Sequence, residues 1–211
     1  EKDGTQAVHW LERAAEQDFP RAFDLLGDCA ADGVGMEQDP AKAAEYYRRG
    51  AELDYPPAMV SLGLCYENGR GVEADPARAL ELYCRAGERG EPAGACNAGY
   101  CYLTGIGTDV DPSKAIPWLE KSAERDYPRA LDLLGDCCWN GDGVARSDQQ
   151  AAAYYRRGAD QNYAPSLASL GLCYELGRGV AEDEAKAAEL YRRAAEQGYA
   201  YAQCNLGFCY L

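Results

Sequence analysis

Residues 58–72 read AMVSLGLCYENGRGV, and residues 166–180 repeat this stretch as SLASLGLCYELGRGV. The glycine of the Leu-Gly pair belongs to a longer series, at positions 27, 63, 99, 135, 171 and 207, with a constant interval of 36 residues. Leucine precedes five of these glycines, and Ala98 precedes the remaining one. A fixed period of this length is typical of helical repeat arrays. The stretch therefore predicts an all-α fold, and such arrays usually present a binding surface rather than a catalytic pocket.

Each repeat reads as two helices. Asp39-Pro40 begins the first, because Asp accepts backbone N–H groups as an N-cap and Pro suits the first helical position. Apolar residues follow at helical spacing at Ala43, Tyr46, Tyr47 and Gly50. The second helix is expected from about Pro57 to Asn68, with a core stripe of Ala58, Leu62, Cys65 and Tyr66. We call the two the Tyr helix and the Leu-Gly helix.

Two features of the Leu-Gly helix bear on its packing and its end. Gly63 costs about 1 kcal/mol of helix propensity relative to Ala, so its recurrence is best explained by close approach of two helices. The Gly69-Arg70-Gly71 turn ends the helix. This turn joins two helices and lacks the Lys-Ser/Thr of a phosphate-binding loop, so the glycines indicate structure rather than nucleotide binding.

The full pattern is Ala-x-x-Tyr-Tyr, then Leu-Gly-x-Cys-Tyr-x-x-Gly-x-Gly-Val, then Asp-Pro-x-Lys/Arg-Ala. It resembles the Sel1-like repeat, a relative of the tetratricopeptide repeat, and is carried here by Tyr46-Tyr47, Leu62 to Val72 and Asp75 to Ala79. The resemblance covers essentially the whole chain and implies a right-handed α-solenoid of antiparallel helix pairs. We expect one array over 1–211, with repeats at 3–38, 39–74, 75–110, 111–146, 147–182 and an incomplete 183–211.

A second period is three repeats long. Trp10-Leu11, Tyr46-Tyr47 and Leu82-Tyr83 recur in order as Trp118-Leu119, Tyr154-Tyr155 and Leu190-Tyr191, at an offset of 108 residues. This offset predicts that 1–103 and 109–211 arose by internal duplication. Because the chain begins Glu1-Lys2-Asp3 and stops within a repeat, we also expect it to be a segment of a longer protein.

Charge and hydropathy exclude some classes of partner. The formal net charge of −14, from 35 acidic against 21 basic residues, disfavours nucleic acid, whose phosphates need a basic face. It suits a basic protein partner, or simply solubility. No stretch approaches the ~20 apolar residues of a membrane span.

Ten cysteines raise the question of disulfides. Six of them recur two residues after the periodic glycines, at Cys29, Cys65, Cys101, Cys137, Cys173 and Cys209. Stacked equivalents lie about a helix-packing distance of ~10 Å apart, which is too far for a disulfide bridge. We therefore expect small buried thiols, with Cys84–Cys96 as the one pair worth testing. A reduced, thiol-rich chain favours the cytoplasm, although the sequence does not fix the compartment.

The family resemblance implies that the Leu-Gly helices line the concave surface. The positions two residues after and two residues before Leu should then face inward, and each half of the chain presents an acidic repeat followed by two apolar repeats. The predicted partner-binding residues are Asp24, Asp28, Leu64, Tyr100, Asp132, Asp136, Trp139, Leu172 and Phe208. They suit a protein segment with basic and apolar side chains. The alternative is that the apolar members pack against neighbouring helices while the acids are merely solvated.

Catalysis has little support in the sequence. His9 is the only histidine, which excludes His-based triads and multi-histidine metal sites, and we predict no cofactor, metal or catalytic residue. Asp24 and Asp28 share a helix face, but no defined pocket is implied. The sequence predicts a non-enzymatic scaffold or adaptor. The alternatives are a module that self-associates through its apolar row, with the oligomeric state open, and a thiol-redox protein.

Overall fold

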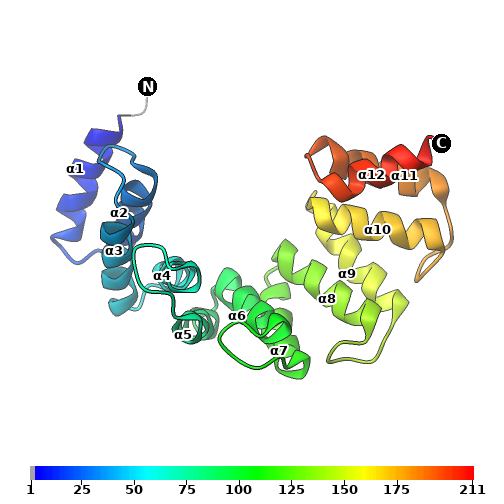
Figure 1. Ribbon diagram of the computed structural model, residues 1–211, viewed down its shortest axis with the longest axis horizontal. Coiled ribbons are helices and arrows are strands. Elements are labelled where there is room, and N and C mark those ends of the chain that lie inside the picture. Colours follow the sequence, from blue (N-terminus) through cyan, green and yellow to red (C-terminus); the bar gives the residue numbers. More distant parts are fainter. Residues whose placement is uncertain (1–2) are drawn as a thin grey trace. The chain divides into compact units, whose positions relative to one another are not determined.

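The computed structural model describes residues 3–211, and these form α-helices connected by short turns, without a β-strand. Figure 1 shows their order along the chain. The bounds are α1 Gly4–Ala15, α2 Pro20–Asp32, α3 Pro40–Glu52, α4 Pro56–Asn68, α5 Pro76–Glu88, α6 Pro92–Thr104, α7 Pro112–Ala123, α8 Pro128–Asn140, α9 Asp148–Asp160, α10 Ala164–Leu176, α11 Glu184–Glu196 and α12 Ala200–Cys209.

Local sequence explains where the helices begin and end. Each Tyr helix follows an N-cap whose side chain accepts a backbone N–H of the first turn, at Asp3, Asp39, Asp75, Asp111, Ser147 and Asp183. The Leu-Gly helices α2 to α10 end at a left-handed glycine, at Gly33, Gly69, Gly105, Gly141 and Gly177. The helix pair predicted for each repeat is therefore confirmed. Helix α7 continues through Pro117, where we expect proline to kink the helix.

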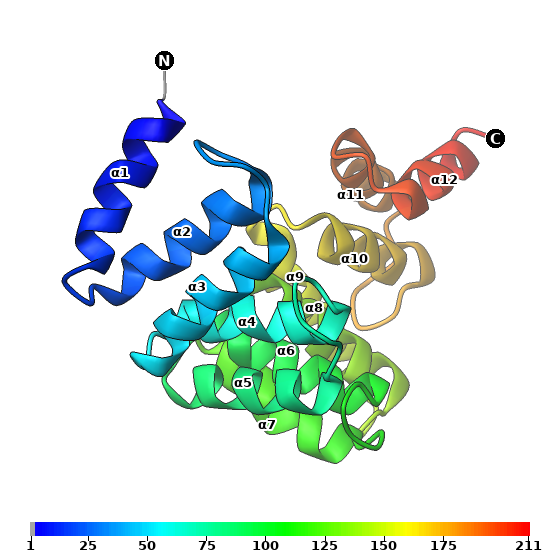
Figure 2. The ribbon, with the colours of Figure 1, turned by 60° about the vertical axis from the view of Figure 1, so that its left-hand side comes forward.

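The chain divides into two compact units, the first ending at Val110 and the second beginning at Asp111, and each is described by itself. In unit 1, α2 packs against α3 and α4, and α4 packs against α5 and α6. In unit 2, α8 packs against α9 and α10, and α10 packs against α11. Figure 2 shows α2, α3 and α4 side by side in unit 1. Each unit is thus a stretch of α-solenoid in which helices that are adjacent in the sequence pack against one another.

A tyrosine ring packs against four of the periodic glycines, Gly27, Gly63, Gly135 and Gly171. A Cβ atom at Gly27 or Gly135 would lie 2.3 Å from Cε1 of Tyr47 or Tyr155, respectively. The corresponding distances are 2.5 Å from Gly63 to Tyr83 and 2.9 Å from Gly171 to Tyr191. Every ring belongs to the next Tyr helix along the chain. The predicted close approach is therefore confirmed, and the approaching group is an aromatic side chain.

The core consists mainly of small and aliphatic residues. The predicted core residues are buried at Ala43, Tyr47, Gly50, Ala58, Leu62, Cys65 and Tyr66, whereas Tyr46 is half-buried. Lys42 lies over the Tyr46 ring, with Nζ 5.6 Å from its centroid. Among residues 3–211, none of the helices has the length and apolar character needed to cross a membrane.

All ten cysteines are free thiols, including Cys84 and Cys96. Six are buried, at Cys65, Cys96, Cys101, Cys137, Cys138 and Cys173. Burial raises the pKa of the Cys137 thiol to about 12 and that of Cys173 to about 11, so both stay protonated at neutral pH and are poor nucleophiles. Most cysteines at the repeated position are thus small buried residues, as predicted, but Cys29 is half-buried and Cys209 is exposed.

Candidate protein-binding face

Two pairs of aspartates lie on Leu-Gly helices, one pair in each unit. Asp24 and Asp28 lie on α2, and Asp132 and Asp136 lie on α8. The spacing of four residues places the members of each pair on one side of their helix. Asp24 and Asp132 are half-buried and Asp28 and Asp136 are more exposed, so each pair begins in the helix interface and reaches the surface.

Hydroxyl groups of the following repeat hold these carboxylates in place. The Tyr47 hydroxyl donates to Asp28 at 2.9 Å, and the Tyr155 hydroxyl donates to Asp136 at 2.7 Å. These tyrosines are the same ones whose rings cover the periodic glycines. The carboxylates are therefore built into the packing between repeats, which the sequence pattern alone does not reveal.

Serine hydroxyls hold the other member of each pair. Ser61 of α4 donates to Asp24 at 3.1 Å, and Ser166 of α10 donates to Asp132 at 2.9 Å. The two serines do not correspond at the offset of 108 residues, since Ser61 matches Ser169 and Ser166 matches Ala58. The two units therefore fix the same aspartate from different positions of the next Leu-Gly helix.

Burial gives these acids unusual protonation behaviour. It raises the pKa of Asp132 to about 7, with the nearby charge of Asp136 as the second cause. It likewise raises the pKa of Asp24 to about 6, reinforced by the charge of Asp28. Burial also raises the pKa of Asp136, against the lowering effect of the Tyr155 hydrogen bond. A cation placed beside either pair would favour the ionised carboxylates, which is the electrostatic basis for binding a basic group.

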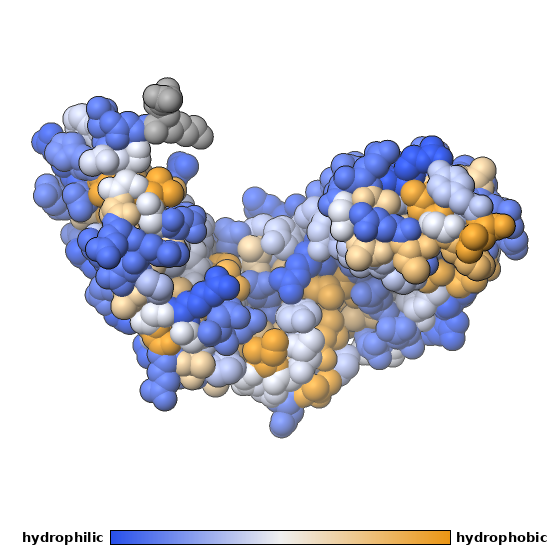
Figure 3. Space-filling model, turned by 45° about the horizontal axis from the view of Figure 1, so that its top comes forward, coloured by the Kyte–Doolittle hydropathy of each residue, from blue (hydrophilic) through white to orange (hydrophobic). Residues whose placement is uncertain are grey.

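The predicted apolar residues differ in accessibility. Leu64 is 44% exposed and Phe208 is 69% exposed, whereas Tyr100 and Leu172 are half-buried. Figure 3 shows that apolar residues reach the visible surface in separate patches among hydrophilic ones. Cys96 and Ala168, at the position two before the leucine or its equivalent, are fully buried, so the expectation that this column faces inward throughout is wrong. Their short side chains end inside the helix packing, while a carboxylate at the same position reaches its edge.

Trp139 is engaged inside the protein. It is half-buried and packs against the core of unit 2, and the Arg178 guanidinium lies 3.3 Å from its ring centroid. Arg178 and its counterpart Arg70 were not among the predicted binding residues. The available signal was their place between the two glycines of the turn that follows the Leu-Gly helix.

A groove of about 670 Å³ in unit 1 brings two predicted residues together. Asp28 and Leu64 both line it, along with Tyr47, Ser61 and Arg70. Its remaining walls come from Ala31, Asp32, Gln38, Pro40, Ala43, Cys65, Gly69 and Gly71. The groove thus combines carboxylates, an apolar side chain and one guanidinium.

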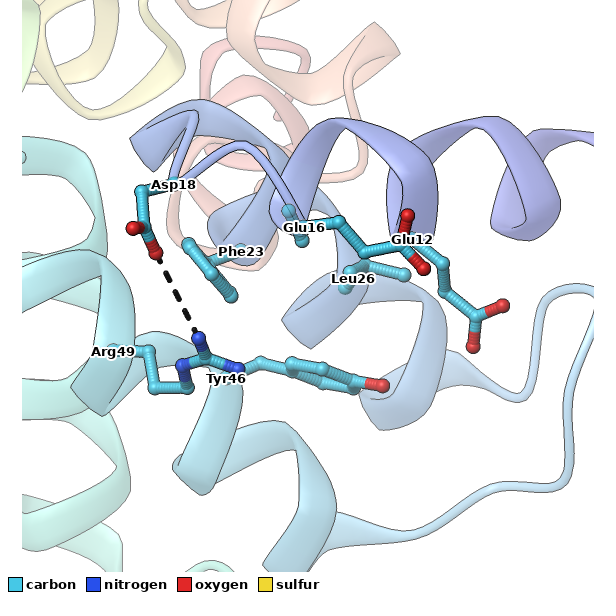
Figure 4. Close-up of a pocket in the computed structure, with 8 residues that line it drawn as sticks. Glu12, Glu16, Asp18, Phe23, Leu26, Tyr46 and Arg49 are labelled. Carbon is cyan, nitrogen blue, oxygen red and sulfur yellow. Dashed lines mark ion pairs between the residues drawn. The ribbon is translucent and has the colours of Figure 1, made fainter.

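A second cavity, of about 440 Å³, lies between α1, α2 and α3 (Figure 4). Glu12 comes from α1 and Glu16 from the C-cap that follows it, Phe23 and Leu26 come from α2, and Tyr46 and Arg49 from α3. Arg49 lies 4.3 Å above the Phe23 ring and 3.8 Å from Asp18. The Arg49 guanidinium is therefore already paired with groups of its own chain. Across residues 3–211, no three His, Cys, Asp or Glu side chains are grouped so that they could hold a metal ion.

The family model of the Sel1 repeat matches residues 1–19, 25–55, 56–91, 92–127, 128–163, 164–199 and 200–211. The chain belongs to the Sel1 repeat family. Each complete match begins near a Leu-Gly helix and includes the following Tyr helix, so a Sel1 repeat spans the glycine and the ring that covers it. No curated protein matches the chain significantly in sequence.

Solved structures of Sel1 repeat proteins share this fold. A protective antigen of uropathogenic Escherichia coli strains, described as having an SLR fold, is 35% identical with a TM-score of 0.87, covering 98% of this chain and 44% of the antigen. The chain therefore spans less than half of the antigen's length. A Sel1 repeat protein from Oxalobacter formigenes is 27% identical with a TM-score of 0.87, covering 100% and 89%. An immunity protein from Pseudomonas aeruginosa is 28% identical with a TM-score of 0.60, covering 87% and 67%.

Proposed function

We propose that this Sel1 repeat chain is a non-enzymatic adaptor that binds a protein segment on its Leu-Gly helices. Sel1 repeat proteins generally act as protein–protein interaction scaffolds. The proposal assigns binding to Asp24, Asp28, Leu64, Tyr100, Asp132, Asp136, Leu172 and Phe208. Trp139, which stacks under Arg178, contributes by shaping the surface rather than by direct contact.

The observation that carries the proposal is the arrangement of the aspartate pairs. Each carboxylate receives a hydroxyl hydrogen bond from the next repeat, and a carboxylate can accept about four hydrogen bonds in all. Acceptor positions therefore remain for Lys or Arg side chains of a partner. In unit 1, Leu64 supplies apolar surface in the same groove as Asp28. A segment that alternates basic and apolar side chains matches both features.

A selection from a displayed library of random 12-residue peptides tests the chemistry of the partner. We expect enrichment of Lys and Arg together with large apolar residues. The selected peptides should bind the Asp132→Asn/Asp136→Asn variant roughly ten-fold more weakly, because two carboxylate contacts are lost. A matched control, Asp160→Asn/Glu189→Gln, removes the same charge from exposed positions on α9 and α11 and should bind normally. Equal binding by all three proteins would refute the proposal.

The exposed apolar residues favour one other candidate function, self-association. Leu64 and Phe208 would then be covered by a second copy of the chain rather than by a different partner. Light scattering over a range of concentrations separates the two. A monomer at high concentration supports the adaptor, whereas a dimer that the Leu64→Ala variant abolishes supports self-association.

A further inference from the structure

Four residues that line the unit 1 groove beside Leu64 differ from their counterparts in unit 2. Most lining residues of the unit 1 groove have identical counterparts 108 positions later, among them Asp28 and Asp136, Tyr47 and Tyr155, and Arg70 and Arg178. The exceptions are Ala31 against Trp139, Asp32 against Asn140, Gln38 against Arg146, and Pro40 against Asp148. Most of the groove lining is therefore duplicated, but four of its residues have changed.

In unit 2 a tryptophan fills this place. The Arg178 guanidinium lies 3.3 Å from the centroid of the Trp139 ring, which is close cation–π stacking. Asp148, the first residue of α9, also fixes the guanidinium, accepting from Nε at 3.1 Å and from Nη2 at 2.5 Å. Trp139 in turn packs against the core of unit 2, so the guanidinium is held by the ring and the carboxylate together.

In unit 1 the same place is open. Ala31 stands where Trp139 would be, and Pro40 stands where Asp148 would be, so Arg70 has neither the ring nor the carboxylate that hold its counterpart. Arg70 is exposed, and all three residues line the groove of about 670 Å³. An exposed guanidinium that lines an open groove complements the negative face of an aromatic ring. Asp28 and Asp32 also line the groove, and their carboxylates complement basic neighbours of such a ring.

We propose that the unit 1 groove binds an aromatic side chain of a partner protein, tryptophan above all, with its ring under Arg70 in the position that Trp139 occupies under Arg178. This inference rests on the proposed function, since the ring anchors the same basic and apolar segment. Beyond the proposed function, it specifies that the anchoring residue is aromatic and that its binding site lies in unit 1. The equivalent position in unit 2 is closed by the chain's own tryptophan.

The test uses the full chain and a defined probe, the peptide acetyl-Gly-Lys-Trp-Lys-Gly-amide, with the same peptide carrying Ala for Trp as its control. Titration is followed by ¹H–¹⁵N NMR at the Arg70 Nε–H group and the Gly69 and Gly71 amides. We expect saturable shifts with a Kd on the order of millimolar or tighter for the tryptophan peptide, and roughly ten-fold weaker binding for the control.

Two variants locate the binding. Ala31→Trp fills the groove as in unit 2, and we expect it to weaken the tryptophan peptide at least ten-fold. Arg70→Gln removes the guanidinium from an exposed turn without touching the core, so it remains informative if the first variant folds poorly; it should also weaken binding. Arg178→Gln, the matched change in unit 2, should leave the peptide unaffected.

The inference fails if the wild-type chain shows no saturable shift, if the Ala peptide binds equally well, or if both unit 1 variants bind normally. Such a failure is distinct from failure of the proposed function. In that case the library peptides would still bind the chain and still depend on Asp132 and Asp136, and only the aromatic anchor would be lost.

Discussion

Replacing Gly135 by alanine should destabilise the protein, although alanine is the better helix former. The added Cβ would lie 2.3 Å from Tyr155 Cε1, whereas ordinary contact begins at about 3.4 Å, so the ring must move by about 3.4 − 2.3 = 1.1 Å. Overpacking of this kind costs about 1–3 kcal/mol, against a gain of about 1 kcal/mol in helix propensity. Displacing the ring also loosens the Tyr155–Asp136 hydrogen bond, worth about 1.5–3 kcal/mol for a charged acceptor. The net expectation is a loss of about 2 kcal/mol.

The chain offers matched controls for this prediction. At Gly207 no atom lies within 4 Å of the added Cβ, so alanine there should stabilise α12 by up to about 1 kcal/mol. At Gly171 the ring of Tyr191 is 2.9 Å away, and the two effects should nearly cancel. Urea unfolding followed by far-ultraviolet circular dichroism gives the three changes from the midpoints. If Gly135→Ala is as stable as Gly207→Ala, the tyrosine ring is not the reason for the glycine.

Three other predictions concern protonation, backbone strain and thiol reactivity. The folded protein keeps the Asp132 proton up to about pH 7, whereas the unfolded chain releases it near pH 4. The stability of the wild-type protein should therefore fall relative to that of Asp132→Asn as the pH rises from about 4 to about 7. A stability difference that does not change with pH would contradict this. Asp126 has a left-handed backbone, with φ 52°, and accepts a hydrogen bond from Arg157 at 2.6 Å. Asp126→Ala and Asp126→Gly both lose this bond, but only alanine keeps the backbone strain, so it should be about 1 kcal/mol less stable in urea than the glycine variant. The reverse order of stability would rule out strain. A thiol titration of the folded protein should show a fast phase from the exposed Cys204 and Cys209. If the fast phase persists in the Cys204→Ser/Cys209→Ser variant, the buried thiols are accessible.

The fold could be predicted from the sequence because its signals are local and repeated. A capping Asp, a proline at the first helical position and a terminal glycine act on their own helix, and six copies average out exceptions such as Ala98 in place of leucine. The periodic glycine also predicted close packing. It could not predict that a tyrosine ring makes the contact, because that requires knowing which face of the next helix meets the glycine.

The candidate site was less predictable because its contacts cross between repeats. Tyr47 reaches Asp28, the residue after its glycine, but Tyr83 donates to Glu67, four residues after its own glycine, at 2.7 Å. The two arrangements use different carboxylates for one repeated hydroxyl, and spacing along the chain does not distinguish them. Trp139 shows a similar limit, since its ring contacts Arg178, which follows two further helices along the sequence.

The contact between glycine and tyrosine also has a direction that matters while the chain is being synthesised. Tyr47 follows Gly27 by 20 residues, and the same distance separates Gly63 from Tyr83 and Gly135 from Tyr155. A Leu-Gly helix that leaves the ribosome therefore remains incomplete until the next Tyr helix has followed it. From then on it is covered without waiting for distant parts of the chain, and contacts between near neighbours in sequence form quickly. Each repeat is thus expected to complete the one made before it, so that folding proceeds from the amino-terminal end in step with translation.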